Sequence, residues 1–310
     1  MTKTKKVSSI LIKKRKYIKN KTSKIYKLNK SKVSGKSDRQ GLSILSILSY
    51  NISWESMSGS VSKWALCNNN TNTNNPRHSS VCVNNISSVF DSDDDDDGEL
   101  DFITLQEATD YNKLIKESDR LKQMKFEVHK SGLDTIVTFW DSKKFKLKQK
   151  ILGEFENGRP WMATMFDYVK KSSKHNNIAY DLCLINIHMG HYDKDEEFQK
   201  LEKMMLDINK NNNDNNDNDN TNTNIIAKRY IISGDFNYDI KKFGNGNGNN
   251  FTLNNTKFYF HPKHIFTCCI NRRKHNDHVI DSLEQPLDIT IPKVSYMASD
   301  HKPIMVRVTI

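Results

Sequence analysis

The chain has 310 residues, which is enough for one large domain or two small ones. Apolar residues make up 36 % of it, below the ~45–50 % that is usual for globular domains. No apolar run approaches the ~20 residues of a transmembrane helix, and no apolar segment of signal-peptide length follows the basic start. We therefore expect neither a transmembrane segment nor a signal peptide.

The positive charge of the chain is concentrated at one end. The formal net charge is +11, yet residues 1–40 hold fifteen Lys and Arg and a single acid. Residues 41–310 hold 33 basic and 36 acidic residues, a net charge of −3. We expect 1–40 to be a disordered tail and 41–310 to be the folded part. The tail fits a nuclear targeting signal, an arm that binds nucleic acid or a contact with an anionic membrane, and solvated disorder is the alternative.

The cysteines bear on the compartment. Five of them, an odd number in a chain of this size, favour a reducing intracellular compartment, nuclear or cytoplasmic. Cys268 and Cys269 are adjacent and have no metal-ligating partner at a usual spacing, so we expect buried thiols there. We expect the protein to be a monomer.

Apolar segments of strand length, rich in Val, Ile, Phe and Tyr, follow one another along the folded part. In chain order they are residues 42–52, 101–107, 133–141, 161–169, 179–188, 229–237, 277–283 and 301–310. Helices are predicted at about 109–123 and at 193–208. The second helix carries a buried stripe of Phe198, Leu201, Met204, Met205 and Ile208. These elements predict an α/β fold of two packed sheets flanked by helices.

Three polar segments interrupt this series. Residues 67–98 read from CNNNTNTNNPRHSS to DSDDDDDG, residues 208–224 read INKNNNDNNDNDNTNTN, and residues 244–250 read GNGNGNN. Low-complexity sequences of this kind have no apolar face to bury, so we expect loops inserted between strands. The aspartate run is either a solvated loop or a weak attractor of cations.

Polar side chains stand at the ends of several predicted strands. In chain order they are Asn51, Glu107, Asn186 with His188, Asp235 with Asn237, and Asp300 with His301. Residues two apart on a strand share a face. One polar residue at a strand end is usually a cap or a turn, whereas several in succession indicate one shared site.

The strand-end residues belong to motifs that resemble the endonuclease/exonuclease/phosphatase superfamily. In order, the motifs are SYN (49–51), LQE (105–107), NIH (186–188), GDFN (234–237), DHVI (277–280) and SDHKPI (299–304). Members of this superfamily include DNase I, apurinic endonucleases, deadenylases, inositol polyphosphate 5-phosphatases, sphingomyelinases and tyrosyl-DNA phosphodiesterases. Each motif is weak alone, but their shared order is specific. The resemblance implies a DNase I-like four-layer α/β sandwich, two packed mixed β-sheets flanked by helices, with a metal site at the strand ends.

The resemblance also implies a role for each residue. Glu107 would bind Mg²⁺, with Mn²⁺ as the alternative, and Asn51 and Asp300 would lie beside the ion, which prefers oxygen ligands. Asp235 would orient or deprotonate the attacking water, and Asn237 would hold a phosphoryl oxygen.

Two histidines complete the implied set. His301 would donate to a phosphate oxygen or shuttle the proton, and His188 would contact the scissile phosphate from the other side. Asp277 would fix the tautomer of His301, as carboxylates do for catalytic imidazoles. Asp281 is its rival, although DHVI fits the family pattern of an acid, a polar or aromatic residue and two apolar residues better than DSLE does.

Other candidates have a structural alternative of equal or greater weight. Arg159 in NGRPW would lie near the phosphate, or would form a loop salt bridge. Arg272 and Arg273 in NRRK suit phosphate, but a solvated turn explains them too. Trp54 is interpreted as a packing residue rather than as a platform for a base. The remaining histidines with no partner pattern are interpreted as non-catalytic: His191, His261, His264, His275 and His278.

The sequence therefore predicts a divalent-metal-dependent phosphoesterase, of the nuclease type, that hydrolyses phosphodiester bonds in nucleic acid. A phosphoinositide or inositol polyphosphate 5-phosphatase is the alternative, because GDFNYDI shares that branch's Asn-Tyr pair. Asp239 stands where the branch has an arginine, and the tryptophan of its Trp-Cys-Asp-Arg-Ile block is missing. A non-catalytic binding relative is a further alternative, against which every expected site residue is present.

Overall fold

A computed structural model describes a large part of the chain. The described residues are 44–58, 77–92, 99–169, 180–191, 194–210, 227–243, 249–261, 266–268, 274–284, 287–292 and 299–310. The predicted tail 1–40, the arginines Arg272 and Arg273, His264 and Cys269 lie outside them. Residues 211–224 of the second predicted insertion and 244–248 of the third lie outside them as well. Helix α6 takes up the first residues of the second insertion, since it ends at Lys210.

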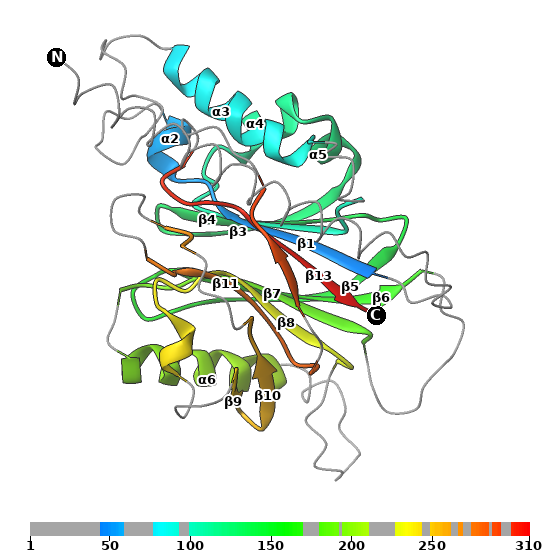
Figure 1. Ribbon diagram of the computed structural model, residues 1–310, viewed down its shortest axis with the longest axis vertical. Coiled ribbons are helices and arrows are strands. Elements are labelled where there is room, and N and C mark those ends of the chain that lie inside the picture. Colours follow the sequence, from blue (N-terminus) through cyan, green and yellow to red (C-terminus); the bar gives the residue numbers. More distant parts are fainter. Residues whose placement is uncertain are drawn as a thin grey trace, which may run out of the picture. The chain divides into compact units, whose positions relative to one another are not determined.

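Two β-sheets form the centre of the fold (Figure 1). In spatial order the six-stranded sheet consists of β12 (Asp288–Thr290), β13 (Ile304–Thr309), β1 (Ile44–Asn51), β2 (Phe102–Gln106), β4 (Asp134–Trp140) and β3 (Lys125–Ser131). The seven-stranded sheet consists of β5 (Phe145–Glu154), β6 (Pro160–Tyr168), β7 (Leu182–His188), β8 (Tyr230–Asp235), β11 (Asp277–Asp281), β10 (Thr256–Tyr259) and β9 (Asn250–Leu253). Strands β1 and β2 are parallel, as are β7 and β8, while the other pairs are antiparallel. Both sheets are therefore mixed, as predicted.

The sheets pack face to face and helices cover their outer faces (Figure 1). Helices α3 (Arg77–Phe90), α4 (Tyr111–Glu117) and α5 (Asp119–Gln123) lie over the six-stranded sheet. Helix α6 (Lys194–Lys210) lies under the seven-stranded sheet. The predicted four-layer α/β sandwich is confirmed.

Strand β1 shows why a continuous apolar run forms a central strand. Its alternate residues Leu45 and Ile47 join the core between the sheets, whereas Leu48 and Tyr50 join the core under helices α3 to α5. Successive side chains of a strand point to opposite faces, and both faces are covered here. Apart from the small buried Ser46 and Ser49, the run therefore stays apolar until it reaches Asn51.

The predicted helical stripe of 193–208 is also buried. Leu201, Met204, Met205 and Ile208 lie in the core formed with the seven-stranded sheet, and Phe198 packs against it. Spacings of three and four residues place these side chains on one face of the helix. The apolar face thus fixes α6 against the sheet that carries half of the strand ends.

The expectation of a loop throughout residues 67–98 is wrong for residues 77–90, which form helix α3. Val83, Ile86, Val89 and Phe90 are buried against the six-stranded sheet. Their spacing of three or four residues is helical, but serines and asparagines between them conceal the pattern. The rest of that predicted insertion lies outside the described residues, apart from Asp91 and Ser92.

The cysteines also differ from the expectation. Cys183 is a free thiol inside β7, and burial raises the pKa of this thiol. Cys82 and Cys268 are disulfide-bonded, so the expectation of a buried thiol at Cys268 is wrong. No helix in the described part of the chain is long and apolar enough to span a membrane.

Candidate active site

Strand register brings the predicted site residues to one edge of the sandwich. His188 and Asp235 lie opposite each other where the parallel strands β7 and β8 end. Strand β11 runs antiparallel to β8, so its first residue, Asp277, also lies opposite Asp235. In the other sheet Asn51 ends β1 beside the end of β2, and Glu107 follows β2 directly.

Asn51 joins the acids of the two sheets. Its Nδ2 donates to Oδ2 of Asp235 at 2.9 Å and to Oε1 of Glu107 at 3.3 Å. Its Oδ1 accepts from the backbone N–H of Ser53 at 3.0 Å. The amide oxygen, which is the atom that can bind a metal, therefore faces the turn after β1, while the amide nitrogen holds the two carboxylates.

Glu107 and Asn237 both end their strands in the left-handed backbone region, with φ of 55° and 52°. This conformation costs free energy in a residue other than glycine, and such positions cluster at functional sites. At Glu107, Oε2 accepts from the N–H of Trp54 at 3.1 Å, and the next residue, Ala108, donates its N–H to the carbonyl of Thr135 at 2.8 Å. The turn after β2 is thereby fixed on both sides.

Asn237 organises the end of β8. Its backbone N–H donates to Oδ1 of Asp235 at 2.7 Å, and its Nδ2 donates to the carbonyl oxygen of Met189 at 2.7 Å. Its Oδ1 accepts from Nδ2 of Asn276 at 3.3 Å. Both carboxylate oxygens of Asp235 are therefore held, Oδ1 by Asn237 and Oδ2 by Asn51.

A carboxylate fixes the imidazole of His301. Nδ1 of His301 donates to Asp277, at 2.9 Å from Oδ2 and 3.1 Å from Oδ1. Nε2 lies 3.8 Å from Oδ2 of Asp235. The rival acid, Asp281, is at the other end of β11, where it accepts from the guanidinium of Arg229. The structure thus pairs His301 with Asp277 and not with Asp281.

A second imidazole–carboxylate pair was not predicted from the sequence. Nδ1 of His188 lies 2.7 Å from Oδ2 of Asp134, and Nη1 of Arg159 lies 3.0 Å from the same oxygen. Burial by itself would raise the pKa of Asp134, but these two donors outweigh it and lower the pKa to about 2. Asp134 is therefore ionised and accepts only, so Nδ1 of His188 carries the proton.

The two pairs converge on one oxygen. With Nδ1 bound to Asp134, Nε2 of His188 lies 3.7 Å from Oδ2 of Asp235 and 3.6 Å from Oε1 of Glu107. Nε2 of His301 approaches Oδ2 of Asp235 at 3.8 Å. Both imidazoles thus present Nε2 toward the same buried carboxylate.

The neighbouring carboxylates raise the pKa of both imidazoles. Burial alone would lower the pKa of His301, but the charges of Asp277 and Asp235 raise it well above its usual value. Burial has the same effect on His188, and its bond to Asp134 outweighs it, so that its pKa is also raised.

Negative charge gathers on the side of the site formed by the six-stranded sheet. The pKa of Asp300 is raised to about 6, first by burial and then by neighbouring carboxylates that include Glu107, Asp277 and Glu55. Oxygen-rich clusters of this charge suit Mg²⁺. Glu107 and Asp300 stay the metal residues predicted from the sequence, and among the described residues Asp235, Asp277 and His301 form a further group whose possible ligand atoms lie within 4.8 Å of one another.

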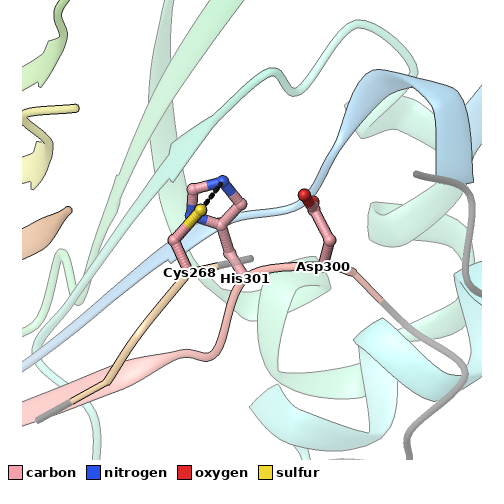
Figure 2. Close-up of side chains that lie close together, drawn as sticks. All are labelled: Cys268, Asp300 and His301. Atoms are coloured by element: carbon pink, nitrogen blue, oxygen red, sulfur yellow. Dashed lines mark hydrogen bonds between the residues drawn. The ribbon is translucent and has the colours of Figure 1, made fainter. Parts of the chain in front are cut away.

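One grouping of possible metal ligands is excluded by its chemistry. Cys268, Asp300 and His301 lie close together, with Sγ of Cys268 3.4 Å from Nε2 of His301 (Figure 2). Figure 2 shows the carboxylate of Asp300 beside the imidazole, and the ligand atoms of the three residues all lie within 4.8 Å of one another. Since Cys268 is disulfide-bonded, its sulfur is not the thiolate that a metal requires.

Some sequence candidates have other surroundings than expected. Asn186 lies inside the sandwich, where its Nδ2 donates to the carbonyls of Leu105 and Val137, and it is a link between the sheets rather than a site residue. Arg159 forms the predicted salt bridge, but with Asp134 of the site. Trp54, interpreted from the sequence as a packing residue, is 46 % exposed.

Comparisons with known proteins agree with this fold. No family model matches the chain. Uncharacterized protein L684 of Acanthamoeba polyphaga mimivirus is 29 % identical over 256 residues, covering 76 % of this chain and 45 % of that protein. The chain therefore spans somewhat less than half of this relative.

Solved structures are similar over most of the chain. ANGEL2, a 2′,3′-cyclic phosphatase, in complex with adenosine-2′,3′-vanadate, has a TM-score of 0.58 at 14 % identity, covering 86 % of this chain and 95 % of its own. TDP2 from C. elegans has a TM-score of 0.54 at 12 % identity, covering 86 % and 75 %. An endonuclease/exonuclease/phosphatase family protein from Bacteroides thetaiotaomicron has a TM-score of 0.51 at 13 % identity, covering 87 % and 96 %.

At these identities the likeness establishes the fold. The chain has the DNase I-like fold of the endonuclease/exonuclease/phosphatase superfamily. The resemblance predicted from the strand-end motifs is confirmed at that level.

Proposed function

We propose that this protein is a divalent-metal-dependent phosphoesterase that hydrolyses phosphodiester bonds in nucleic acid. The convergence of two imidazole–carboxylate pairs on Asp235 supports the proposal most directly. Hydrolysis of a phosphodiester needs an aligned water, neutralisation of the phosphoryl oxygens and a proton for the leaving oxygen. The residues at the strand ends meet each need.

Glu107 and Asp300 would hold the metal ion, and Asn51 would orient Glu107 through its amide nitrogen. Bound Mg²⁺, or Mn²⁺, would neutralise charge on the phosphoryl oxygens and on the leaving oxygen. The accumulation of carboxylates around Asp300 supports this assignment, because no Lys or Arg of the described residues forms an ion pair with Asp300 or Glu107.

Asp235 would align the attacking water and accept its proton. Asn237 and Asn51 hold its two oxygens, so the carboxylate is oriented before the substrate binds. Such preorganisation contributes to catalysis because no reorientation is needed at the moment of reaction. Nδ2 of Asn237 has two N–H groups, of which one is bound to the carbonyl of Met189, and the other would contact a phosphoryl oxygen.

The two imidazoles would contact the phosphate from opposite sides of Asp235. Asp277 and Asp134 hold the Nδ1 atoms, which leaves both Nε2–H groups directed into the site. Fixed donors of this kind stabilise the charge that develops on phosphoryl oxygens. His301 would also supply the proton for the leaving oxygen, since its pKa is raised in the free protein.

Two observations support nucleic acid over a phosphoinositide. ANGEL2 was solved with adenosine-2′,3′-vanadate, which carries a nucleoside. In addition, the position that the 5-phosphatase branch fills with arginine holds Asp239, whose carboxylate accepts from the N–H of Lys241 at 3.3 Å and caps a short helix at Ile240–Lys242.

The test is a substrate panel for the purified chain with Mg²⁺. The panel contains an abasic duplex, single-stranded DNA, poly(A) RNA and a 5-phosphoinositide, and Asp235→Asn serves as the inactive control. We expect hydrolysis of at least one nucleic acid that stops in EDTA and in the control. Hydrolysis of the phosphoinositide alone would replace the proposed substrate, and no activity on any substrate would contradict the proposed function.

A further inference from the structure

Two aromatic side chains are exposed beside the site and have no part in the proposed chemistry. Trp54 is 46 % exposed and Phe266 is 42 % exposed. Scattered exposed apolar side chains are normal on protein surfaces. Trp54 and Phe266 are not scattered in this way. Trp54 follows β1 of the six-stranded sheet and Phe266 precedes β11 of the seven-stranded sheet, so each side of the site carries one exposed aromatic residue.

The backbone of Trp54 is bound to the predicted metal ligand. Its N–H donates to Oε2 of Glu107 at 3.1 Å. The preceding residue, Ser53, has a φ of 56° and donates its N–H to Oδ1 of Asn51. The backbone of Trp54 is therefore held one hydrogen bond away from Glu107, while the residue as a whole is 46 % exposed. A large aromatic surface left exposed at a fixed place beside a polar site is typical of a binding platform.

Phe266 is tied to the other half of the site in the same way. The next residue, Thr267, accepts the N–H of Asp277 on its Oγ1 at 3.0 Å. Cys268 follows and contacts Nε2 of His301 at 3.4 Å (Figure 2). The ring of Phe266 lies 4.5 Å from that of His275, with an interplanar angle of 32°. The ring of His275 thus supports the phenyl ring, two residues before the cysteine that contacts His301.

We propose that Trp54 and Phe266 stack unpaired nucleobases on the two sides of the scissile phosphodiester, which makes single-stranded nucleic acid the substrate class. This inference rests on the proposed function. Every base has an aromatic face, so stacking on a protein ring is tolerant of sequence and strong for each base. In a duplex the bases are already stacked on each other, and an inositol ring has no flat apolar face. Trp54 and Phe266 therefore select strands whose bases are free.

The test measures binding in the Asp235→Asn background with Mg²⁺, where turnover does not interfere. The probes are a labelled single-stranded oligodeoxynucleotide, the single-stranded RNA of the same sequence, the duplex, and a phosphodiester chain of equal length whose units lack bases. Trp54→Ala and Phe266→Ala should each weaken binding of the single strands about fivefold or more, the lower end of the range for a base on an aromatic ring. Binding of the base-free chain should change less than about twofold.

Control variants at other exposed apolar residues, together with a fluorescence readout, show whether a loss of binding is specific to Trp54 and Phe266. Ile44, 60 % exposed at the opposite end of β1, and Leu283, 37 % exposed beyond the opposite end of β11, should have no effect when replaced by alanine. Trp54→Phe should retain most of the affinity, since it keeps an aromatic face. Part of the tryptophan fluorescence should be quenched when the single strand binds, and Trp54→Leu should remove that part. Thermal midpoints show which variants remain folded.

The outcomes separate this inference from the proposed function. Equal loss for the base-containing and base-free chains would overturn the stacking role, and so would unchanged binding of both. If the wild-type protein hydrolyses single strands in Mg²⁺ but the aromatic variants behave as the wild type, the proposed function stands and the inference is wrong. If no phosphoester is hydrolysed, the proposed function is wrong, and a base-dependent loss of binding still supports the platforms. DNA and RNA are distinguished by which single strand binds more tightly.

Discussion

The strand pair β8 and β11 carries aspartates at both ends, and the two ends differ in how the aspartate charge is neutralised. At one end Asp281 accepts from the buried guanidinium of Arg229, which also donates to the carbonyl of Thr309 at 2.8 Å. At the other end Asp235 and Asp277 lie opposite each other and are approached by imidazoles. The first end is a neutral, closed pair that joins strands. The second end concentrates negative charge, which suits a cation and a reaction but contributes less to stability.

The largest effect is expected on removal of the metal, which would act only at the end that holds Asp235 and Asp277. Activity on any phosphoester should vanish in EDTA and return with Mg²⁺ or Mn²⁺. Glu107→Gln should raise the metal concentration needed for half-maximal rate, because it removes a charged oxygen ligand. Rates measured against metal concentration check both statements. Full activity in EDTA would contradict the assignment of the whole site.

Asp235→Asn is expected to separate chemistry from folding. The change removes the charge that polarises the water and should reduce the rate by roughly 10²–10⁴-fold, the range for a lost general base. The fold should be retained, because an amide has the size of the carboxylate. Turnover and the thermal midpoint are measured on the same preparation. Retained turnover in a folded variant would mean that GDFN forms only a turn.

Arg229→Met should have the reverse effect at the closed end. It leaves the charge of Asp281 buried without a cation beside it, with only the N–H of Leu283 still donating, and should lower the free energy of unfolding by about 3–5 kcal/mol, while the rate constant of the folded protein stays unchanged. The double change Arg229→Met with Asp281→Leu should cost much less, since no charge is left unpaired. Chemical denaturation measures all three proteins. A loss of rate in the folded single variant would show that the two ends are coupled.

His278 gives the smallest expected effect and a pH dependence. It is half-buried beside the site, and its Nε2 donates to the carbonyls of Tyr238 and His275. Burial, as the main cause, lowers its pKa from 6.5 to about 4. The unfolded chain therefore takes up a proton that the folded chain resists. The stability that depends on this residue is complete above the unfolded pKa and decreases as the pH falls from about 6.5 to about 4, by about 3 kcal/mol in total.

His278→Gln removes the titration but keeps an N–H donor. The difference in unfolding free energy between the variant and the wild type should shift in favour of the variant as the pH falls through that window. Unfolding in urea at several pH values measures this difference. A difference that is independent of pH would show that the residue titrates alike in the folded and unfolded chains.

Much of the fold follows from local sequence. Strands that are covered on both faces, such as β1 and β7, consist mainly of apolar residues. The bounds of these two strands were predicted within a few residues. Strand β5 was missed because lysines alternate with apolar residues along it, Lys146, Lys148 and Lys150 being exposed at the edge of the sheet. Helix α3 was missed because serines and asparagines dilute its apolar face. Edge and surface elements carry weak patterns, since only one face is buried.

The sequence by itself was enough to locate the polar residues at the strand ends, from Asn51 to His301. An apolar run that stops at an acid or an amide is a local pattern, and it can be recognised without knowing the fold. Only the tertiary structure decided the partners. Asp134 lies at the start of the predicted strand 133–141, where the sequence pattern gave it no role, yet it fixes His188 across 54 positions of sequence. The sequence pattern favoured Asp277 over Asp281, and the register of β11 with β8 places Asp277 at the end of the strand where it contacts His301. Contacts of this kind depend on how strands are aligned in space, which no local pattern encodes.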